Sequence, residues 1–132
     1  MIHSSVGSHR DLKPANILIE PDEKGNVKYL KITDFGLSTL FEDHDSWCGS
    51  PPYMAPEYFA PDCKKTNSVD IWAFGVILYE LLFGEHPFWD GSEKIEHITP
   101  KGFAEKISKA HEMIQQELEN DNKLRKLLEG CL

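Results

Sequence analysis

DIWAFGVILYELLF, residues 70–83, is the most apolar segment of the chain. Either Asn67 or Ser68 can cap a helix through this segment, and Gly84 is suited to end it. Its apolar residues surround the expected helix instead of following one stripe. A soluble helix that is apolar on all sides must be covered on every face, so we expect it to be the central helix of its domain.

Two amphipathic segments follow this helix. Apolar residues recur there at steps of three and four, with charged residues between them, which places each set on one face of a helix. The two sets are Phe103, Ile107, Ala110, Ile114 and Leu118, and Leu124, Leu127, Leu128, Cys131 and Leu132. We therefore expect two surface helices.

The first third of the chain predicts short strands and loops. Residues 16–20 (NILIE) and 27–32 (VKYLKI) are typical of strands, and residues 21–26 between them carry turn residues, which predicts a hairpin. From Leu40 to Pro61 the four prolines and the weak periodicity predict an extended surface loop. Together with the helices, these elements predict a fold of the α+β class that is mainly α.

Composition and charge narrow the class of protein. A chain of 132 residues suits one compact domain, and 40% hydrophobic with 27% charged residues is typical of a folded protein rather than a disordered one. Fourteen Lys and Arg against 22 Asp and Glu give a net charge of −8. This charge disfavours indiscriminate binding to nucleic acid or to anionic membranes.

The cysteines and the apolar segments indicate the cellular compartment in which the protein is expected. Cys48, Cys63 and Cys131 show neither CxxC nor zinc-like spacing, so neither a disulfide framework nor a metal cluster is indicated. The amino terminus reaches charged residues before any apolar stretch, and the most apolar run contains Glu80 and is too short to span a bilayer. We expect a cytoplasmic protein, with the nucleus left open.

Three short motifs occur in order along the chain: HRDLKPAN at 9–16, DFG at 34–36 and APE at 55–57. Each alone is weak evidence because tripeptides recur by chance, but their order and the intact Asp-x-x-x-x-Asn spacing of the first are specific. Together they resemble the catalytic half of a eukaryotic protein kinase of the serine/threonine type. The resemblance covers nearly the whole chain, most securely residues 9–88.

The resemblance implies a catalytic role for two residues. Asp11 is the expected base, which orients the substrate hydroxyl and accepts its proton, and Lys13 is expected to place an ammonium beside the transferring phosphate of ATP. The alternatives are a loop aspartate that caps its own turn and a solvated surface lysine.

The resemblance also implies cofactors and supporting residues. Asn16 and Asp34 match two ligands of Mg²⁺, which prefers oxygen ligands together with nucleotide phosphates. Asp70 is expected to hold the backbone of the catalytic loop, although a simple helix N-cap is its rival interpretation. The remaining motif residues are expected to be structural: His9, Phe35, Gly36 and Glu57.

Residues 46–57 (SWCGSPPYMAPE) resemble an activation and substrate-docking segment. Ser46 lies where many kinases are phosphorylated by an upstream kinase, and Arg10 is the candidate to pair with that phosphate. Ser46 as an ordinary loop serine stays the alternative, with nearby acidic residues at 42, 43 and 45 substituting in part for phosphate. Ser50, a docking residue, and Lys13 favour serine or threonine of a protein substrate as the acceptor.

Other parts of the kinase pattern are missing from the sequence. Only eight residues precede His9, and no pair of the nine glycines has the Gly-x-Gly spacing of a phosphate-binding loop. The resemblance therefore implies a large, C-terminal lobe that is truncated at both ends, with the ATP-binding small lobe absent. Within it we expect a catalytic loop at 9–16, a metal-binding and activation segment at 34–57 and a helical subdomain at 66–132.

Two functions follow from these observations. The first is transfer of the ATP γ-phosphate to protein hydroxyls when the small lobe is supplied. The alternative is a non-catalytic module that binds a partner through the face of residues 102–132 and an uncovered core, or a fragment from an incomplete gene model. Affinity for ATP and Mg²⁺ discriminates between them.

Overall fold

The computed structural model describes residues 7–38, 49–59, 66–91 and 99–132. The chain divides into two compact units, Met1–Ala73 and Phe74–Leu132. The described elements are three helices, one two-stranded sheet and several short 3₁₀ turns, which is the mainly helical α+β composition predicted from the sequence. None of the described helices is both long and apolar enough to cross a lipid bilayer.

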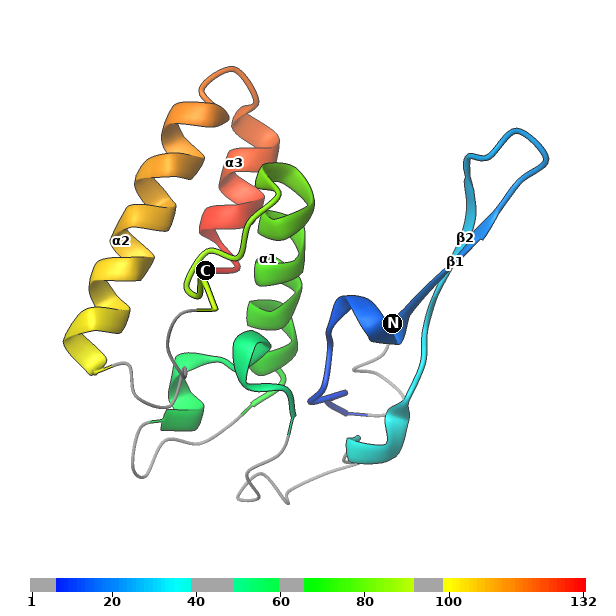
Figure 1. Ribbon diagram of the computed structural model, residues 1–132, viewed down its shortest axis with the longest axis horizontal. Helices are drawn as coiled ribbons and strands as arrows, with labels where there is room; N and C mark the ends of the chain where they lie inside the picture. The colour runs from blue at the N-terminus through cyan, green and yellow to red at the C-terminus, as the bar shows by residue number, and fades with distance from the viewer. Residues whose placement is uncertain (1–6, 39–48, 60–65, 92–98) are drawn as a thin grey trace. The chain divides into compact units, whose positions relative to one another are not determined.

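The hairpin of the first unit pairs β1 (Ile17–Pro21) with β2 (Val27–Ile32) in antiparallel register, with Ile17 opposite Ile32 and an irregularity at Glu20/Pro21. Figure 1 shows it as a narrow two-stranded arm. The turn is closed by Asp22, whose Oδ1 accepts hydrogen bonds of 2.8 Å from the N–H groups of Lys24 and Asn26.

The first strand begins one residue later than predicted. Asn16 belongs to the 3₁₀ turn Pro14–Asn16, where its N–H donates to the carbonyl oxygen of Lys13 at 3.0 Å. Proline fits the first position of such a turn because its fixed φ suits the helix and its missing N–H needs no partner there. Asn16 is consequently a turn residue placed directly before the hairpin.

The loop predicted from Leu40 to Pro61, which contains the APE motif, also differs from the prediction in its described part. Instead of an extended surface loop, the described part at 49–59 forms two 3₁₀ turns, Pro51–Tyr53 and Pro56–Phe59. Met54, Ala55 and Tyr58 are buried there. Pro51 and Pro56, two of the prolines that suggested an extended loop, instead begin the two turns, because proline is favoured at the first position of a helical turn.

Helix α1 (Ser68–Phe83) matches the predicted central helix in its bounds. It ends at Gly84, which has φ 76° and donates its N–H to the Glu80 carbonyl oxygen at 2.9 Å. The expectation that the helix is covered on every face is wrong for the described chain. Val76 and Tyr79 are buried, but one side carries exposed apolar residues, namely Ile71, Phe74, Leu81 and Leu82.

The second unit contains the two amphipathic helices, α2 (Pro100–Glu117) and α3 (Asn122–Glu129), which pack together (Figure 1). Thr99 caps α2 and Asp121 caps α3 through side-chain oxygens that accept from Gly102 and Leu124 N–H groups. Each cap satisfies a backbone donor that has no partner within its helix.

The apolar faces of these helices follow the predicted stripes. Ile114 and Leu128 have no exposed surface, and Ala110 is 2% exposed. Leu127 departs from the prediction because it is 48% exposed and lies outside the buried stripe of α3. Its position is one residue before Leu128, and adjacent residues of a helix point in different directions.

Candidate active site

The loop that begins with His9 and Arg10 is held by the first turn of α1. Asp70 is 4% exposed, and its two carboxylate oxygens accept hydrogen bonds from the His9 N–H at 2.8 Å and the Arg10 N–H at 2.9 Å. Arg10 has φ 69°, a left-handed conformation that is costly for a residue with a side chain. The charged acceptor therefore stabilises a backbone geometry that the loop would not adopt alone.

The His9 imidazole links this loop to the end of the hairpin. Its Nδ1 accepts from the Asp11 N–H at 3.3 Å, so Nε2 carries the proton and donates to the Thr33 carbonyl oxygen at 2.9 Å. The ring also meets Phe35 edge-on, with centroids 4.8 Å apart. His9 thereby fixes the backbone on both sides of the candidate site.

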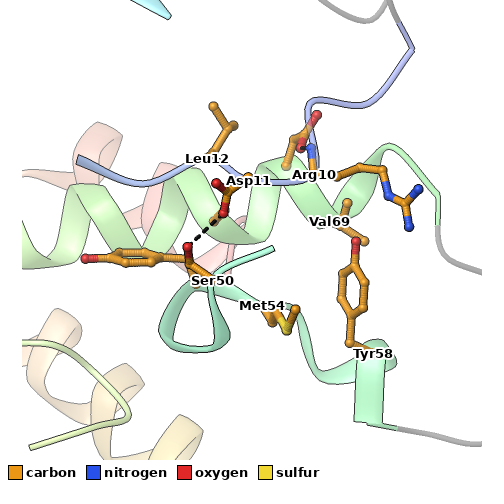
Figure 2. A pocket seen from close by; sticks show the side chains of 10 residues that line it. Arg10, Asp11, Leu12, Ser50, Met54, Tyr58 and Val69 are labelled. Atoms are coloured by element: carbon orange, nitrogen blue, oxygen red, sulfur yellow. Dashed lines mark hydrogen bonds between the residues drawn. The ribbon is translucent and has the colours of Figure 1, made fainter. Parts of the chain in front are cut away.

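Asp11, Lys13 and Ser50 form a closed ring of hydrogen bonds. Lys13 Nζ donates to Asp11 Oδ2 and to Ser50 Oγ, and Ser50 Oγ donates to Asp11 Oδ1, each at 2.8 Å. Figure 2 shows the Ser50 side chain directed at the carboxylate. Ser50 lies 37 positions after Lys13 and 39 positions after Asp11 in the sequence. The fold thus brings the predicted docking residue into contact with the two predicted catalytic residues.

Burial alone would raise the pKa of Asp11, because it disfavours the charged carboxylate. The hydrogen bonds from Lys13 and Ser50, the Lys13 charge and a weaker bond from Asn16 outweigh burial and hold this pKa below its ordinary value. Asp11 is therefore an ionised acceptor at neutral pH. An ionised carboxylate is the state that a proton-accepting base requires.

Asn16 and Asp34 both lie at the base of the hairpin, next to its paired strands. The Asn16 carbonyl oxygen accepts a hydrogen bond from the Thr33 N–H at 2.9 Å. Because Asp34 directly follows Thr33, this bond holds the backbone of Asp34 near Asn16. Asn16 Nδ2 donates to the Asp11 carbonyl oxygen at 2.9 Å. Because this bond uses the Nδ2 atom, the amide oxygen Oδ1 of Asn16 points away from the Asp11 carbonyl oxygen.

The two side chains present oxygen atoms of the kind that a hard cation takes. Asp34 is exposed, has φ 63°, and uses one oxygen to accept from the Gly36 N–H at 3.4 Å. Its second oxygen receives no hydrogen bond from the described residues. An amide oxygen and a free carboxylate oxygen fit Mg²⁺, which completes its shell with water and phosphate oxygens.

A narrow pocket of about 10 Å³ lies beside this ring, between the loop at 10–12, the turn at 50–58 and the start of α1 (Figure 2). Its volume is enough for about one water molecule.

Arg10 is 6% exposed, and in Figure 2 its guanidinium lies on the side away from Asp11. Glu57 accepts a 3.3 Å hydrogen bond from Ser68 Oγ. Ser46 lies outside the described residues.

Two contacts of the site are absent from the sequence-based predictions. One is the Thr33 carbonyl oxygen that orients His9, and the other is the 2.5 Å hydrogen bond from Ser8 Oγ to Asn67 Oδ1. The position of Thr33 directly before Asp34 is the only sequence signal for the first. Nothing in the sequence relates Ser8 to a residue 59 positions away.

Comparison with known proteins gives the family. The protein kinase domain model matches residues 1–132, which is the whole chain. The chain belongs to the protein kinase domain family. The HRDLKPAN, DFG and APE motifs and the ring at Asp11 therefore lie within a protein kinase domain.

The relatives of this kinase chain are longer proteins. A probable myosin light chain kinase of Dictyostelium discoideum is 37% identical over 143 residues, covering 99% of this chain and 44% of the relative. A calcium/calmodulin-dependent protein kinase type II of Caenorhabditis briggsae is 46% identical over 91 residues, covering 67% and 16%. A serine/threonine-protein kinase of Drosophila persimilis is 46% identical over 88 residues, covering 66% and 12%. The chain spans less than half of each of these relatives.

Proposed function

We propose that the chain is the C-terminal lobe portion of a serine/threonine protein kinase, which transfers the γ-phosphate of ATP to protein hydroxyls. Its parts are the catalytic loop at 9–16, the metal-binding and activation segment at 34–57 and the helical subdomain at 66–132. The observation that carries the proposal is the Asp11 carboxylate, which is held ionised by Lys13 and faces a hydroxyl at Ser50. The named serine/threonine kinase among the relatives supports the acceptor type.

Each residue of the site has a task in this reaction. Bound ATP and Mg²⁺ supply the phosphoryl group and the charge that compensates it. Asp11 Oδ1, which accepts a hydrogen bond from the Ser50 hydroxyl, takes the proton of the substrate hydroxyl. Lys13 Nζ would offset negative charge at the phosphate, and Asn16 and Asp34 would hold the cation.

The proposal extends to the activation segment. Arg10 is to receive a phosphate placed on Ser46 by an upstream kinase, which orders the segment through a charge-assisted pair. The left-handed backbone of Arg10 supports this role because it fixes where the side chain starts. A Ser46→Ala variant that keeps full activity would contradict it.

The test uses the native gene product, tagged at its own locus and purified. With ATP, Mg²⁺ and a mixed peptide library, we expect transfer to serine and threonine and not to tyrosine. Asp11→Asn should lower the rate on the order of 10²–10⁴-fold, the usual contribution of a positioned base. Asp22→Asn, at the exposed hairpin turn, is the matched control and should not change the rate.

One observation favours a second function, binding of a protein partner without catalysis. The exposed apolar residues on one side of α1 include Leu81, which is 78% exposed, and such a side suits an interface. Calorimetric titration of the purified gene product with ATP and Mg²⁺ separates the two functions. Measurable affinity supports the kinase, and no binding at millimolar ATP supports the interaction module.

A further inference from the structure

Ser50 already occupies the place that the proposed reaction gives to an acceptor hydroxyl. Its Oγ lies 2.8 Å from the carboxylate oxygen Asp11 Oδ1 and 2.8 Å from Lys13 Nζ. The side chain is partly exposed, so the hydroxyl is not sealed in a core. A hydroxyl that donates to a base and faces an ammonium is arranged as a phosphate acceptor.

The backbone holds Ser50 there independently of its side chain. Gly49 has φ 113°, a region that residues with a Cβ rarely adopt. A Cβ at this position would lie 2.6 Å from the Arg10 carbonyl oxygen, so only glycine lets the segment pass so close to the catalytic loop. The backbone conformation at Gly49 therefore places the Ser50 hydroxyl next to Asp11.

We propose that Ser50 is a phosphorylation site and that its phosphate switches the proposed kinase off. The inference rests on the proposed function, because the switch acts on the same Asp11 and Lys13. In the modification, Ser50 Oγ forms a bond to the γ-phosphorus of a nucleoside triphosphate while the bond from that phosphorus to the β–γ bridging oxygen breaks. The diphosphate leaves, and the hydroxyl proton passes to the carboxylate base of the kinase that performs the step.

A phosphate at Ser50 removes the features that prepare Asp11. The phosphoserine has no hydroxyl proton to donate to Asp11 Oδ1, and it brings a charge of about −1.5 to −2 beside the carboxylate. Repulsion between the two anions separates them, and the phosphate competes with Asp11 for Lys13 Nζ. The base then faces an anion in place of a substrate hydroxyl.

The first experiment maps phosphate on the native gene product by mass spectrometry, before and after incubation with ATP and Mg²⁺. Phosphate on Ser50 that increases during incubation in the wild type but not in Asp11→Asn shows self-modification. Phosphate on Ser50 that is equal in the two proteins as purified shows that another kinase supplies it. Either result supports the site, and Ser50 without phosphate in both proteins under both conditions overturns it.

The second experiment installs phosphoserine at position 50 and, as a matched control, at position 108, an exposed serine of α2. We expect transfer to fall on the order of 100-fold or more for position 50, because a positioned base contributes at least that much. The control should keep the unmodified rate. Ser50→Ala, which loses the hydroxyl without gaining charge, should fall less than the phosphorylated protein. An unchanged rate with phosphoserine at position 50 overturns the switch.

Hydrogen exchange gives a readout that does not depend on transfer. Repulsion between the phosphate and Asp11 should raise amide exchange at residues 50–55 on the order of tenfold, while phosphate at position 108 leaves that segment unchanged. Unchanged exchange at 50–55 overturns the switch even in a protein that transfers no phosphate. Absence of transfer from the unmodified protein contradicts the proposed function instead, so the two failures are distinguishable.

Discussion

Both units of the chain bury apolar side chains, but they differ in the polar side chains that they bury. All of the buried charged or strongly polar residues in the described part of the chain belong to the first unit: Ser8, His9, Arg10, Asp11, Asn16 and Asp70. The largest fully buried side chains of the second unit are Tyr79, Ile114, Leu128 and Val76, and three of these are purely apolar. The candidate site lies entirely in the polar unit.

The difference separates two sources of order. Buried hydrogen bonds give modest net stability but are costly to break, so they fix one geometry for Asp11 and its neighbours. Apolar burial is not directional and supplies most of the driving force for folding. We infer that the first unit depends on a few specific hydrogen bonds in addition to its apolar burial, whereas the second depends mainly on the volume of its core.

The largest effect should come from Asp70→Ala. It removes the acceptor of two buried N–H groups, and hydrogen bonds to charged groups are worth about 1.5–3 kcal/mol each, so about 3–6 kcal/mol should be lost. Native-state hydrogen exchange should locate the loss at residues 8–12.

The matched control for this change is Asp22→Ala at the exposed hairpin turn. It also removes hydrogen bonds to two backbone N–H groups, but water can replace the carboxylate there. We expect it to leave exchange at residues 8–12 unchanged. Equal effects of the two substitutions on that segment would show that burial of Asp70 is not what makes its bonds important.

The second-largest effect is expected in the apolar unit. Ile114 has no exposed surface, and Ile114→Ala should cost about 2–5 kcal/mol through lost burial and the cavity left behind. Urea unfolding followed by circular dichroism measures the loss. Leu127→Ala is the control, because Leu127 is 48% exposed and its truncation should cost far less. A similar cost for both would mean that the α2–α3 interface is loosely packed.

The sequence predicted periodic and motif-bearing features well. Apolar spacing places Ala110 and Ile114 on a buried face, and α1 ends at Gly84 as expected, because both signals lie within a few residues. The structure also brings Asp11, Lys13 and Ser50 together, a contact that the sequence motifs, which gave each residue a separate role, did not predict.

Long-range contacts and burial were not predictable in the same way. The 3₁₀ turns at 51–59 are buried through contacts that no local pattern encodes, so the loop prediction failed there. A hydropathy pattern likewise could not predict the exposed side of α1, because it shows that Leu81 is apolar but not whether other residues cover it. The hydrogen bonds from His9 to Thr33 and from Ser8 to Asn67 depend on the completed fold.

A smaller effect should follow from Gly75→Ala in the apolar unit. A Cβ at Gly75 would lie 2.6 Å from Cys131 Cβ and 2.9 Å from Leu132 Cδ2, closer than packed atoms allow. Cys131 and Leu132 must shift, at a cost of about 1–3 kcal/mol typical of overpacking. Cys131 should then be alkylated faster, as read by mass spectrometry of its peptide. Ser108→Ala, at an exposed position of α2, should leave this rate unchanged.

The smallest effect at neutral pH concerns a polar atom in the apolar core, and the cost of removing it should shrink as pH rises above the ordinary pKa of tyrosine. Tyr79 is 2% exposed, and its hydroxyl donates to Met113 Sδ at 2.7 Å. Tyr79→Phe should cost about 0.5–1.5 kcal/mol, the usual net value of one such bond. Tyr29→Phe, with Tyr29 52% exposed on β2, is the matched control and should cost less.

Burial, and to a lesser degree the negative charge of Glu85, raises the pKa of Tyr79 above its ordinary value. The folded state therefore holds the phenol proton more tightly than the unfolded chain does. This contribution to stability is complete below about pH 10, the ordinary pKa of tyrosine, and is lost as pH rises through the higher folded value. Alkaline unfolding should begin above about pH 10 in the wild type and be weaker in Tyr79→Phe. Identical alkaline profiles would show that the core admits the phenolate, and the contrast between a polar and an apolar unit would then be less sharp than the buried residues indicate.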